Sequence, residues 1–237
     1  MHTYALHLAI GSVLPMALKA AIELELLEII VRAGPGAMLS PADIAAKLPT
    51  ANPQAAVMVD RILRLLAAYS VVSCTVEAGD DGRPRISTAP RVCKYLTKNE
   101  DGVSLASMSL MNQDKVLMGK LVIRRERCGV GRKAASPFNN ATGMAPFEYH
   151  GSDPRFNRLF NDSMRGHSTI LMKKLLQVYC GFDSIEVLVD VGGGIGATLH
   201  MITSRHSTSR ASTSTFLMSS VRHHPTQEWS MLVEICL

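Results

Sequence analysis

The sequence lacks several features that would assign it to a protein class at once. No apolar run reaches the ~18 uninterrupted residues of a membrane-spanning helix, so we expect no transmembrane segment. The five cysteines lie far apart and form no Cys-x-x-Cys pair, which argues against a zinc site or a disulfide framework and favours reduced thiols in the cytoplasm. No lysine or arginine precedes Lys19, so the amino terminus has no basic region of a secretory signal peptide.

Instead, the composition is that of a globular protein, with 47% hydrophobic and 19% charged residues among 237. The net charge of +5 would suit a nucleic-acid partner, but its position in the sequence argues against one. Residues 119–136 alone carry six Lys/Arg and one Glu, a net +5 that equals the excess of the whole chain. We therefore expect no nucleic-acid partner.

The first hundred residues have a winged-helix outline. Residues 4–31 are apolar on most faces and predict a buried helix with a break near Pro15. Ser40 and Asp43 form an S-x-x-D capping box at the start of a further helix, and residues 53–72 repeat apolar side chains at helical spacing. Residues 73–90 then predict a short hairpin around the Gly-Asp-Asp-Gly turn.

Many winged helices bind DNA, but this one lacks the charges for it. Its presumed recognition helix carries only Asp60, Arg61 and Arg64, and Glu77 and Asp80 lie on the predicted wing. Phosphate binding requires clustered Lys/Arg on one face. A DNA-binding function is therefore disfavoured.

The second half predicts helices over residues 102–118 and 153–180, the latter ending at Gly181 as a C-cap, and a short buried strand over residues 184–191. The strand leads into DVGGGIGATL, where glycines let the backbone turn sharply and approach a ligand before a helix begins. This strand–glycine loop–helix unit is of Rossmann type.

Two ligand classes fit the loop. The D-x-G-x-G-x-G spacing is that of class I S-adenosylmethionine (SAM) methyltransferases, whereas Gly192, Gly194 and Ala197 also fit a G-x-G-x-x-A dinucleotide site. The loop lacks the Lys-Ser/Thr of a P-loop, which argues against nucleotide hydrolysis. Both ligand classes require an acidic residue about 20 positions further on, and no Asp or Glu occurs from Val191 to Gln227.

Five stretches together resemble the plant caffeic acid O-methyltransferases and their phenylpropanoid and flavonoid relatives: MVDRILRLLA, LMNQDKVLM, FEYHGSDPRFNRLFN, HSTILMKKLL and LVDVGGGIGA. The resemblance implies a mainly α, winged-helix-like dimerisation domain (residues 1–101). An incomplete α/β Rossmann-type class I methyltransferase domain (102–206) and an aberrant, disordered tail (207–237) would follow. Such enzymes methylate phenolic hydroxyls with SAM, act as dimers and use no metal.

The resemblance also implies site residues. Side chains lining the phenolic pocket would be Met111, Asn112, Leu117, His150, Phe156, Phe160, Met164 and His167, among which Met and Phe suit an aromatic ring. SAM would be held by Ser168, Asp190, Gly192, Gly193, Gly194 and Gly196. Without the resemblance, the Met and Phe residues would be read as core and the histidines as structural.

Two segments depart from the family pattern, residues 119–141 and 207–237. One codon choice for SRASTSTFLMSS, read one base earlier, gives IKGINFDLPHVI, and one for EWSMLVEICL gives GVEHVGGDMF, both of which resemble family motifs. A codon choice for the stretch that begins with RCGVG likewise reads DAVLDG in its second frame. We infer frameshifts, which remove the ribose-binding Asp at the codons of Ser214 and Thr215.

The chemical expectation is a catalytically defective chain. The resemblance places the general-base histidine and its orienting carboxylates beyond Leu237, and a phenol with a pKa of ~10 needs such a base. The shifted frame explains His223 and His224 without a catalytic role. The alternative function is a non-catalytic dimerisation module that pairs with itself or with an intact relative.

The frameshift hypothesis makes a prediction about the transcript. We expect the codons of residues 209–220 and 228–237 to encode both family motifs when read one base earlier. Sequencing the transcript tests this, and codons incompatible with either alternate frame would contradict it.

Overall fold

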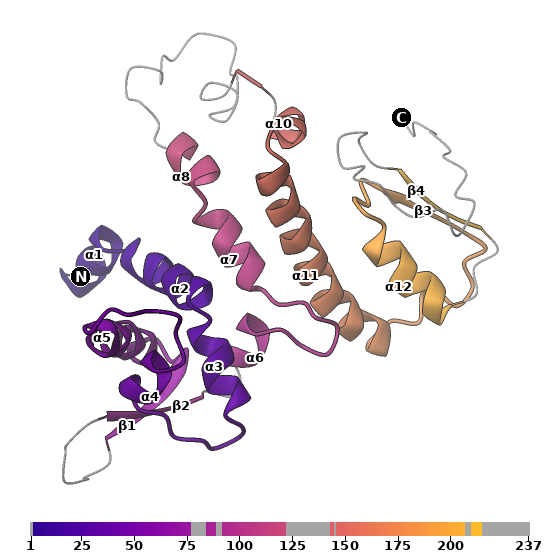
Figure 1. Cartoon of the computed structure of the whole chain (residues 1–237). Coiled ribbons are helices and arrows are strands. Elements are labelled where there is room, and N and C mark those ends of the chain that lie inside the picture. Colours follow the sequence, from indigo (N-terminus) through magenta and orange to yellow (C-terminus); the bar gives the residue numbers. More distant parts are fainter. Residues whose placement is uncertain are drawn as a thin grey trace. The chain divides into compact units, whose positions relative to one another are not determined.

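The computed structural model describes residues 2–76, 84–88, 92–121, 143–144, 146–206 and 210–214. The chain divides into two compact units, Met1–Gln113 and Asp114–Leu237. Figure 1 labels the helices and strands of each unit.

The described part of the first unit combines short helices with one hairpin. Its helices are α1 (His2–Ala9), α2 (Val13–Glu23), α3 (Leu26–Arg32), α4 (Pro41–Ala45), α5 (Ala55–Ala68), α6 (Cys93–Leu96) and α7 (Ala106–Asn112). Its strands, β1 (Val72–Val76) and β2 (Pro84–Thr88), pair antiparallel with Val72 opposite Thr88 and Val76 opposite Pro84. The predicted helix–hairpin outline is confirmed.

The helix predicted over residues 4–31, with a break near Pro15, has breaks at two places, because the segment forms α1, α2 and α3 and the first break lies at residues 10–12. Pro15 does not break a helix, since it lies in the first turn of α2, where its missing N–H has no intrahelical partner to lose. The second break falls at Glu25, whose φ of 52° is left-handed and turns the chain before α3 begins.

The predicted capping box at α4 is confirmed. The Asp43 N–H donates to Ser40 Oγ at 3.2 Å, and the Ser40 N–H donates to Asp43 Oδ2 at 2.9 Å. These bonds satisfy two backbone donors around the helix start. Pro41 occupies the first helical position and has no N–H to satisfy.

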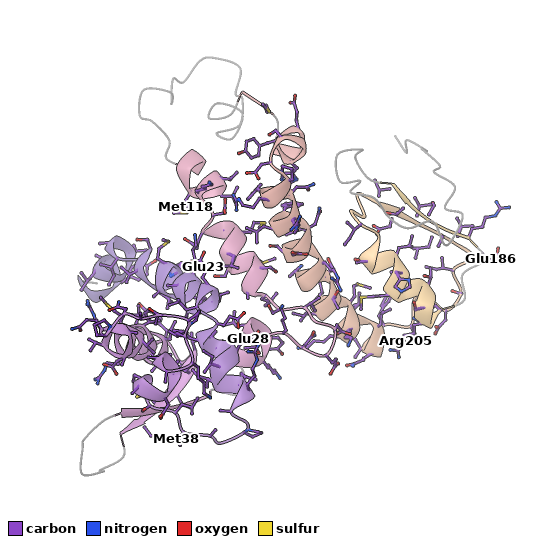
Figure 2. The ribbon with its side chains drawn as sticks, viewed as in Figure 1. Glu23, Glu28, Met38, Met118, Glu186 and Arg205 are labelled. Atoms are coloured by element: carbon purple, nitrogen blue, oxygen red, sulfur yellow. The ribbon has the colours of Figure 1, made fainter. Side chains whose placement is uncertain are left out.

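The core of the first unit is built mainly from apolar faces of α2, α3, α4 and α5. On α5, Val59, Leu63 and Leu66 are buried, whereas Val57 and Met58 are exposed. The α5 core face packs with buried side chains of α2, α3 and α4: Ala21, Leu26, Leu27, Ile30 and Ile44. The Glu28 carboxylate, labelled in Figure 2, accepts a hydrogen bond from the Lys98 backbone N–H at 3.0 Å and ties α3 to the segment after α6.

The described part of the second unit is a helical segment followed by a βαβ unit. Its elements are α8 (Lys115–Leu121), α10 (Pro146–Ser152), α11 (Pro154–Val178), β3 (Val187–Val191), α12 (Ala197–Arg205) and β4 (Arg210–Ser214). The strands β3 and β4 are parallel, with Val187 opposite Arg210 and Val191 opposite Ser214. Leu188 of β3 packs with α11 and α12 around Met172, Leu176 and Ile202 (Figure 1).

The structure corrects several expectations for this unit. The 102–118 helix is split into α7 and α8, and the 153–180 helix ends at Val178 with Tyr179 as its C-cap, so Gly181 is not the cap. The strand β3 is not buried on both faces, because its odd-numbered valines stay exposed among the described residues. Among the described helices, α11 and α12 cover the face that carries Leu188.

Residues 210–214 form β4, although their sequence showed no strand period. Leu188 and its neighbours in β3 have backbone groups that need a parallel partner, and β4 supplies it. The internal segment 122–142, the hairpin turn at residues 79–82, and residues 215–237 with His223 and His224 lie outside the described residues. No helix in the described ranges is long and apolar enough to cross a membrane.

The core face of α5 gives a stability prediction. Leu63→Ala is expected to lower the free energy of unfolding by about 2–5 kcal/mol, because the side chain is fully buried and its removal leaves a cavity. Urea unfolding followed by far-UV circular dichroism measures the change. Val57→Ala, on the exposed side of the same helix, is the control and should stay within about 0.5 kcal/mol of the unmodified chain. Equal losses in both variants would contradict the placement of α5.

Candidate functional site

The glycine loop joins β3 to α12 in a conformation that glycine makes possible. Gly192, Gly194 and Gly196 have φ values of 77°, 58° and 76°, in the left-handed region that favours glycine. Gly196 is the N-cap of α12 and offers no side chain to its amides. The loop therefore presents backbone N–H groups at the start of a helix, which suits a polar or anionic ligand group.

Asp190 and Thr213 lie directly beneath this loop. The Thr213 hydroxyl donates to the Asp190 carbonyl oxygen at 3.2 Å, so the end of β4 is fastened to the end of β3. A Cβ on Gly193 would collide with Thr213 Oγ1 and Asp190 Oδ2. Glycine is therefore required at position 193 by space, rather than by its φ.

One oxygen of the Asp190 carboxyl, the buried Oδ2 atom, has no hydrogen-bond partner within the described ranges. Burial raises the pKa of the Asp190 carboxyl above its ordinary value, because desolvation disfavours the charged form. An unpartnered buried carboxylate oxygen beside a glycine loop fits the donor groups of a nucleoside-type cofactor such as SAM.

The carboxyl end of β4 carries hydroxyl residues where a Rossmann unit carries an acid. Asp190 pairs in register with Thr213, and Val191 pairs with Ser214. The sequence lacks an acidic residue where one was expected, and that position is the end of the strand β4. Sequence reasoning missed β4, although a βα unit that follows a glycine loop commonly returns to a neighbouring parallel strand.

An aromatic cluster forms a second candidate site feature. The His150 ring lies 4.4 Å from the Phe160 ring and 5.6 Å from the Phe156 ring, measured between centroids. Tyr149 meets Phe156 edge-on at 6.3 Å. Burial lowers the pKa of His150 below its ordinary value, so the imidazole is neutral at pH 7. Three of the predicted pocket residues are therefore in direct contact.

The other predicted pocket residues are distributed over several helices. Met164 and His167 follow Phe156 and Phe160 on α11 at spacings of 4 and 3, which places all four along one side of the helix. His167 is exposed, and Ser168 is half-buried on the next position. Leu117 lies on α8.

Met111 and Asn112 belong to the first unit. Met111 is buried at the end of α7, and Asn112 is exposed. The ammonium of Lys19 on α2 donates to the Gln113 carbonyl oxygen at 3.0 Å, so a cation caps the carboxyl end of α7. This contact holds the end of α7, which carries Met111 and Asn112 of the predicted pocket.

Sequence reasoning also missed an ion pair in the second unit between a buried carboxylate and a half-exposed guanidinium. Arg155 Nη1 donates to Asp114 Oδ2 at 2.7 Å, across 41 positions of sequence. Both residues stand inside motifs quoted for the resemblance, but nothing in their spacing indicated that they meet. In the part of the chain that the structure describes, no group of three His, Cys, Asp or Glu side chains could hold a metal ion.

The βαβ unit with its glycine loop defines a Rossmann-type nucleotide-binding fold. Comparison with known families places this fold more closely. Residues 97–229 match the O-methyltransferase domain, and residues 6–99 match the O-methyltransferase dimerisation domain. The chain therefore belongs to the O-methyltransferase family, with a dimerisation domain followed by a methyltransferase domain.

Curated plant relatives agree. Caffeic acid 3-O-methyltransferase of Catharanthus roseus is 57% identical over 203 residues, which are 85% of this chain and 55% of the relative. Flavone O-methyltransferase 1 of Triticum aestivum is 59% identical over 206 residues, 86% of this chain and 56% of the relative. The chain thus spans about half the length of the curated relatives it matches.

Solved structures share the fold at low sequence identity. Human N-acetylserotonin methyltransferase in complex with SAM matches with a TM-score of 0.67 at 17% identity, covering 90% of this chain and 58% of that chain. CalO1, a methyltransferase of calicheamicin biosynthesis in its SAH-bound form, matches with a TM-score of 0.64 at 22% identity. The match covers 98% of this chain and 66% of that chain.

The buried Asp190 carboxyl gives a pH prediction. Because its folded pKa lies above the unfolded value, the folded state keeps a proton that the unfolded chain releases, and stability falls as pH rises through that window. Asp190→Asn removes the charge, so the ligand-free variant should be more stable than the unmodified chain at pH 7. This advantage should shrink as pH falls toward 4.

Urea midpoints between pH 7 and 4 measure the difference. Glu186→Gln is the control, since it neutralises an exposed carboxylate just before β3 (Figure 2). An Asp190→Asn advantage that is constant over this pH range would contradict a raised pKa.

Proposed function

We propose that the chain carries the SAM-binding unit of a phenolic O-methyltransferase. The observation that carries the proposal is the β3–glycine loop–α12–β4 unit, with the buried, unpartnered Oδ2 of Asp190 beneath the loop. Gly192, Gly193 and Gly194 would offer backbone donors. Gly196, whose N–H donates to the Gly193 carbonyl oxygen, would let the backbone approach the ligand closely. Asp190 would accept a hydrogen bond from the ligand, and Ser168 would contact its polar end.

The substrate class is proposed from the aromatic cluster and the relatives together. The largely buried cluster of neutral His150, Phe156 and Phe160 combines apolar rings with one polar imidazole, a composition that suits a phenol. The relatives are named for caffeic acid and flavone. We therefore propose a phenylpropanoid or flavonoid hydroxyl, with Leu117, Met164 and His167 as further pocket residues of the second unit. Met111 and Asn112, which belong to the first unit, stay a prediction from the sequence.

The chemistry requires two contributions. SAM, when bound, supplies a methyl group activated by its sulfonium. The protein must orient the phenol and take its proton, because a phenol with a pKa of ~10 is a weak nucleophile at neutral pH. Here the aromatic cluster orients the ring and excludes water. His150 is neutral, but a lowered pKa makes it a poor proton acceptor.

We propose that these 237 residues bind SAM weakly and do not complete methyl transfer. The end of β4 offers Thr213 and Ser214, and no Asp or Glu follows until position 228. A carboxylate accepts hydrogen bonds from both ribose hydroxyls more strongly than a hydroxyl does. We propose domain divisions of 1–101, 102–206 and 207–237, of which the last contains β4 and is therefore not a disordered tail throughout. The exposed thiols of Cys74 and Cys180 fit the cytoplasm.

The alternative function is dimerisation without catalysis, and one observation favours it. The amino-terminal helices expose large apolar side chains: Tyr4, Leu6, Leu8, Ile10, Val13 and Met16. Exposed apolar patches of this kind mark protein–protein contacts. We propose that α1 and α2 pair with a second copy or with an intact relative.

Equilibrium dialysis with radiolabelled SAM and methyl transfer to caffeic acid test the proposal. We expect weak binding and no turnover, and Gly193→Ala should reduce binding by at least roughly tenfold, because its Cβ displaces Asp190 or Thr213. Gly119→Ala is the control, since its Cβ meets nothing within 4 Å. Turnover by the purified chain would contradict the catalytic defect, and equal binding by both variants would contradict the site.

Sedimentation velocity tests the dimer. Leu8→Glu places a charge on the exposed face of α1 and should shift the chain toward the monomer, because burying an unpaired charge is costly. Met58→Glu, on an exposed position of α5, is the control and should leave the sedimentation unchanged. A monomeric unmodified chain that also fails to join an intact relative would contradict the dimerisation role.

A further inference from the structure

The buried carboxylate of Asp114 caps a helix and forms an ion pair. Its side chain is 10% exposed, and its Oδ1 atom accepts a hydrogen bond from the Val116 N–H at 2.9 Å, which caps the start of α8. A buried charge of this kind is costly unless it is paired. The partner is Arg155, whose Nη1 and Nη2 donate to Asp114 Oδ2 and Oδ1 at 2.7 and 3.0 Å.

Arg155 also faces a second capping carboxylate. Asp153 Oδ1 accepts a hydrogen bond from the Phe156 N–H at 2.9 Å and so caps the start of α11. The other oxygen of Asp153 lies 3.7 Å from Arg155 Nη2. One guanidinium therefore lies between the N-cap carboxylates of two helices, which would repel each other without it.

Both helices carry side chains of the proposed pocket. Leu117 lies three positions after Asp114 on α8, and Phe156 and Phe160 begin α11. The planar guanidinium fork binds a carboxylate in one orientation, so it fixes direction as well as distance. A contact across 41 positions also closes the long segment between α8 and α11, whose middle lies outside the described residues.

We propose that Arg155 is a positioning residue of the phenol site: through Asp114 and Asp153 it holds the start of α8 against the start of α11 and so sets the distance between Leu117 and the aromatic cluster. The proposal rests on the phenol site proposed above. Arg155 itself touches no substrate. Half of its side chain is exposed, so its role is to orient rather than to fill the core.

The test combines ligand affinity with local hydrogen exchange on the full chain. Arg155→Gln removes the charge, and Arg155→Lys keeps the charge but not the fork. Asp114→Asn loses the ion pair and keeps a good N-cap. Arg158→Gln is the matched control, because it removes an exposed cation from the same helix.

Isothermal titration with caffeic acid gives the first readout. We expect roughly tenfold weaker binding for Arg155→Gln and Asp114→Asn, about threefold for Arg155→Lys, and no more than about twofold for Arg158→Gln. The double variant should bind about as weakly as either single variant, because both remove one interaction. Unchanged affinity in folded Arg155→Lys and Asp114→Asn would overturn the proposal, even if their melting temperatures fall.

Hydrogen exchange gives the second readout and needs no ligand. The Val116 and Met118 amides of α8 should lose protection in Asp114→Asn and Arg155→Lys, while the α12 amides of Leu199 and Ile202 stay protected. Unchanged protection of α8, or an equal loss in both helices, would overturn the positioning role. If the unmodified chain binds no caffeic acid, the substrate assignment fails, and this comparison still decides what Arg155 does.

Discussion

The parallel pairing of β3 with β4 is the contact on which the second unit depends. A strand that leads into a glycine loop presents a row of backbone donors and acceptors, and these must be satisfied before the loop can hold a fixed shape. The pairing begins at Glu186, whose carbonyl accepts from the Arg210 N–H, and ends where Thr213 reaches the Asp190 carbonyl. The loop, α12 and the buried Asp190 oxygen all follow from that register.

The same pairing explains why the site combines competent and deficient features. Backbone hydrogen bonding between strands does not depend on which side chains are present. A Ser/Thr-rich segment can therefore provide β4 as well as an apolar one. Ribose recognition does depend on the side chain, since it needs a carboxylate at the strand end. A βαβ unit thus forms around the glycine loop while its outer edge carries hydroxyl groups. This is the physical basis of our proposal that the chain binds SAM weakly.

The two units are stabilised by different means. The first has a core of fully buried leucine and isoleucine side chains, including Leu26, Leu63 and Ile44, and its hairpin and capping box add local order. The second has a small apolar cluster around Met172, Leu176 and Ile202, and it adds polar ties such as the Asp114–Arg155 pair. Its exposed β3 valines show that the described helices cover only one face of the sheet.

The sequence by itself determined the local elements and the family. Helical spacing in α5, the Ser40–Asp43 capping box and the hairpin follow from neighbouring residues, and the motifs around Asp114, Arg155 and Asp190 are specific enough to indicate an O-methyltransferase. Tertiary structure decided where α1, α2 and α3 separate, that residues 210–214 pair with β3, and which motif residues meet. These outcomes depend on contacts between residues distant in sequence, such as the 41 positions between Asp114 and Arg155, and on burial, which no local pattern of side chains specifies.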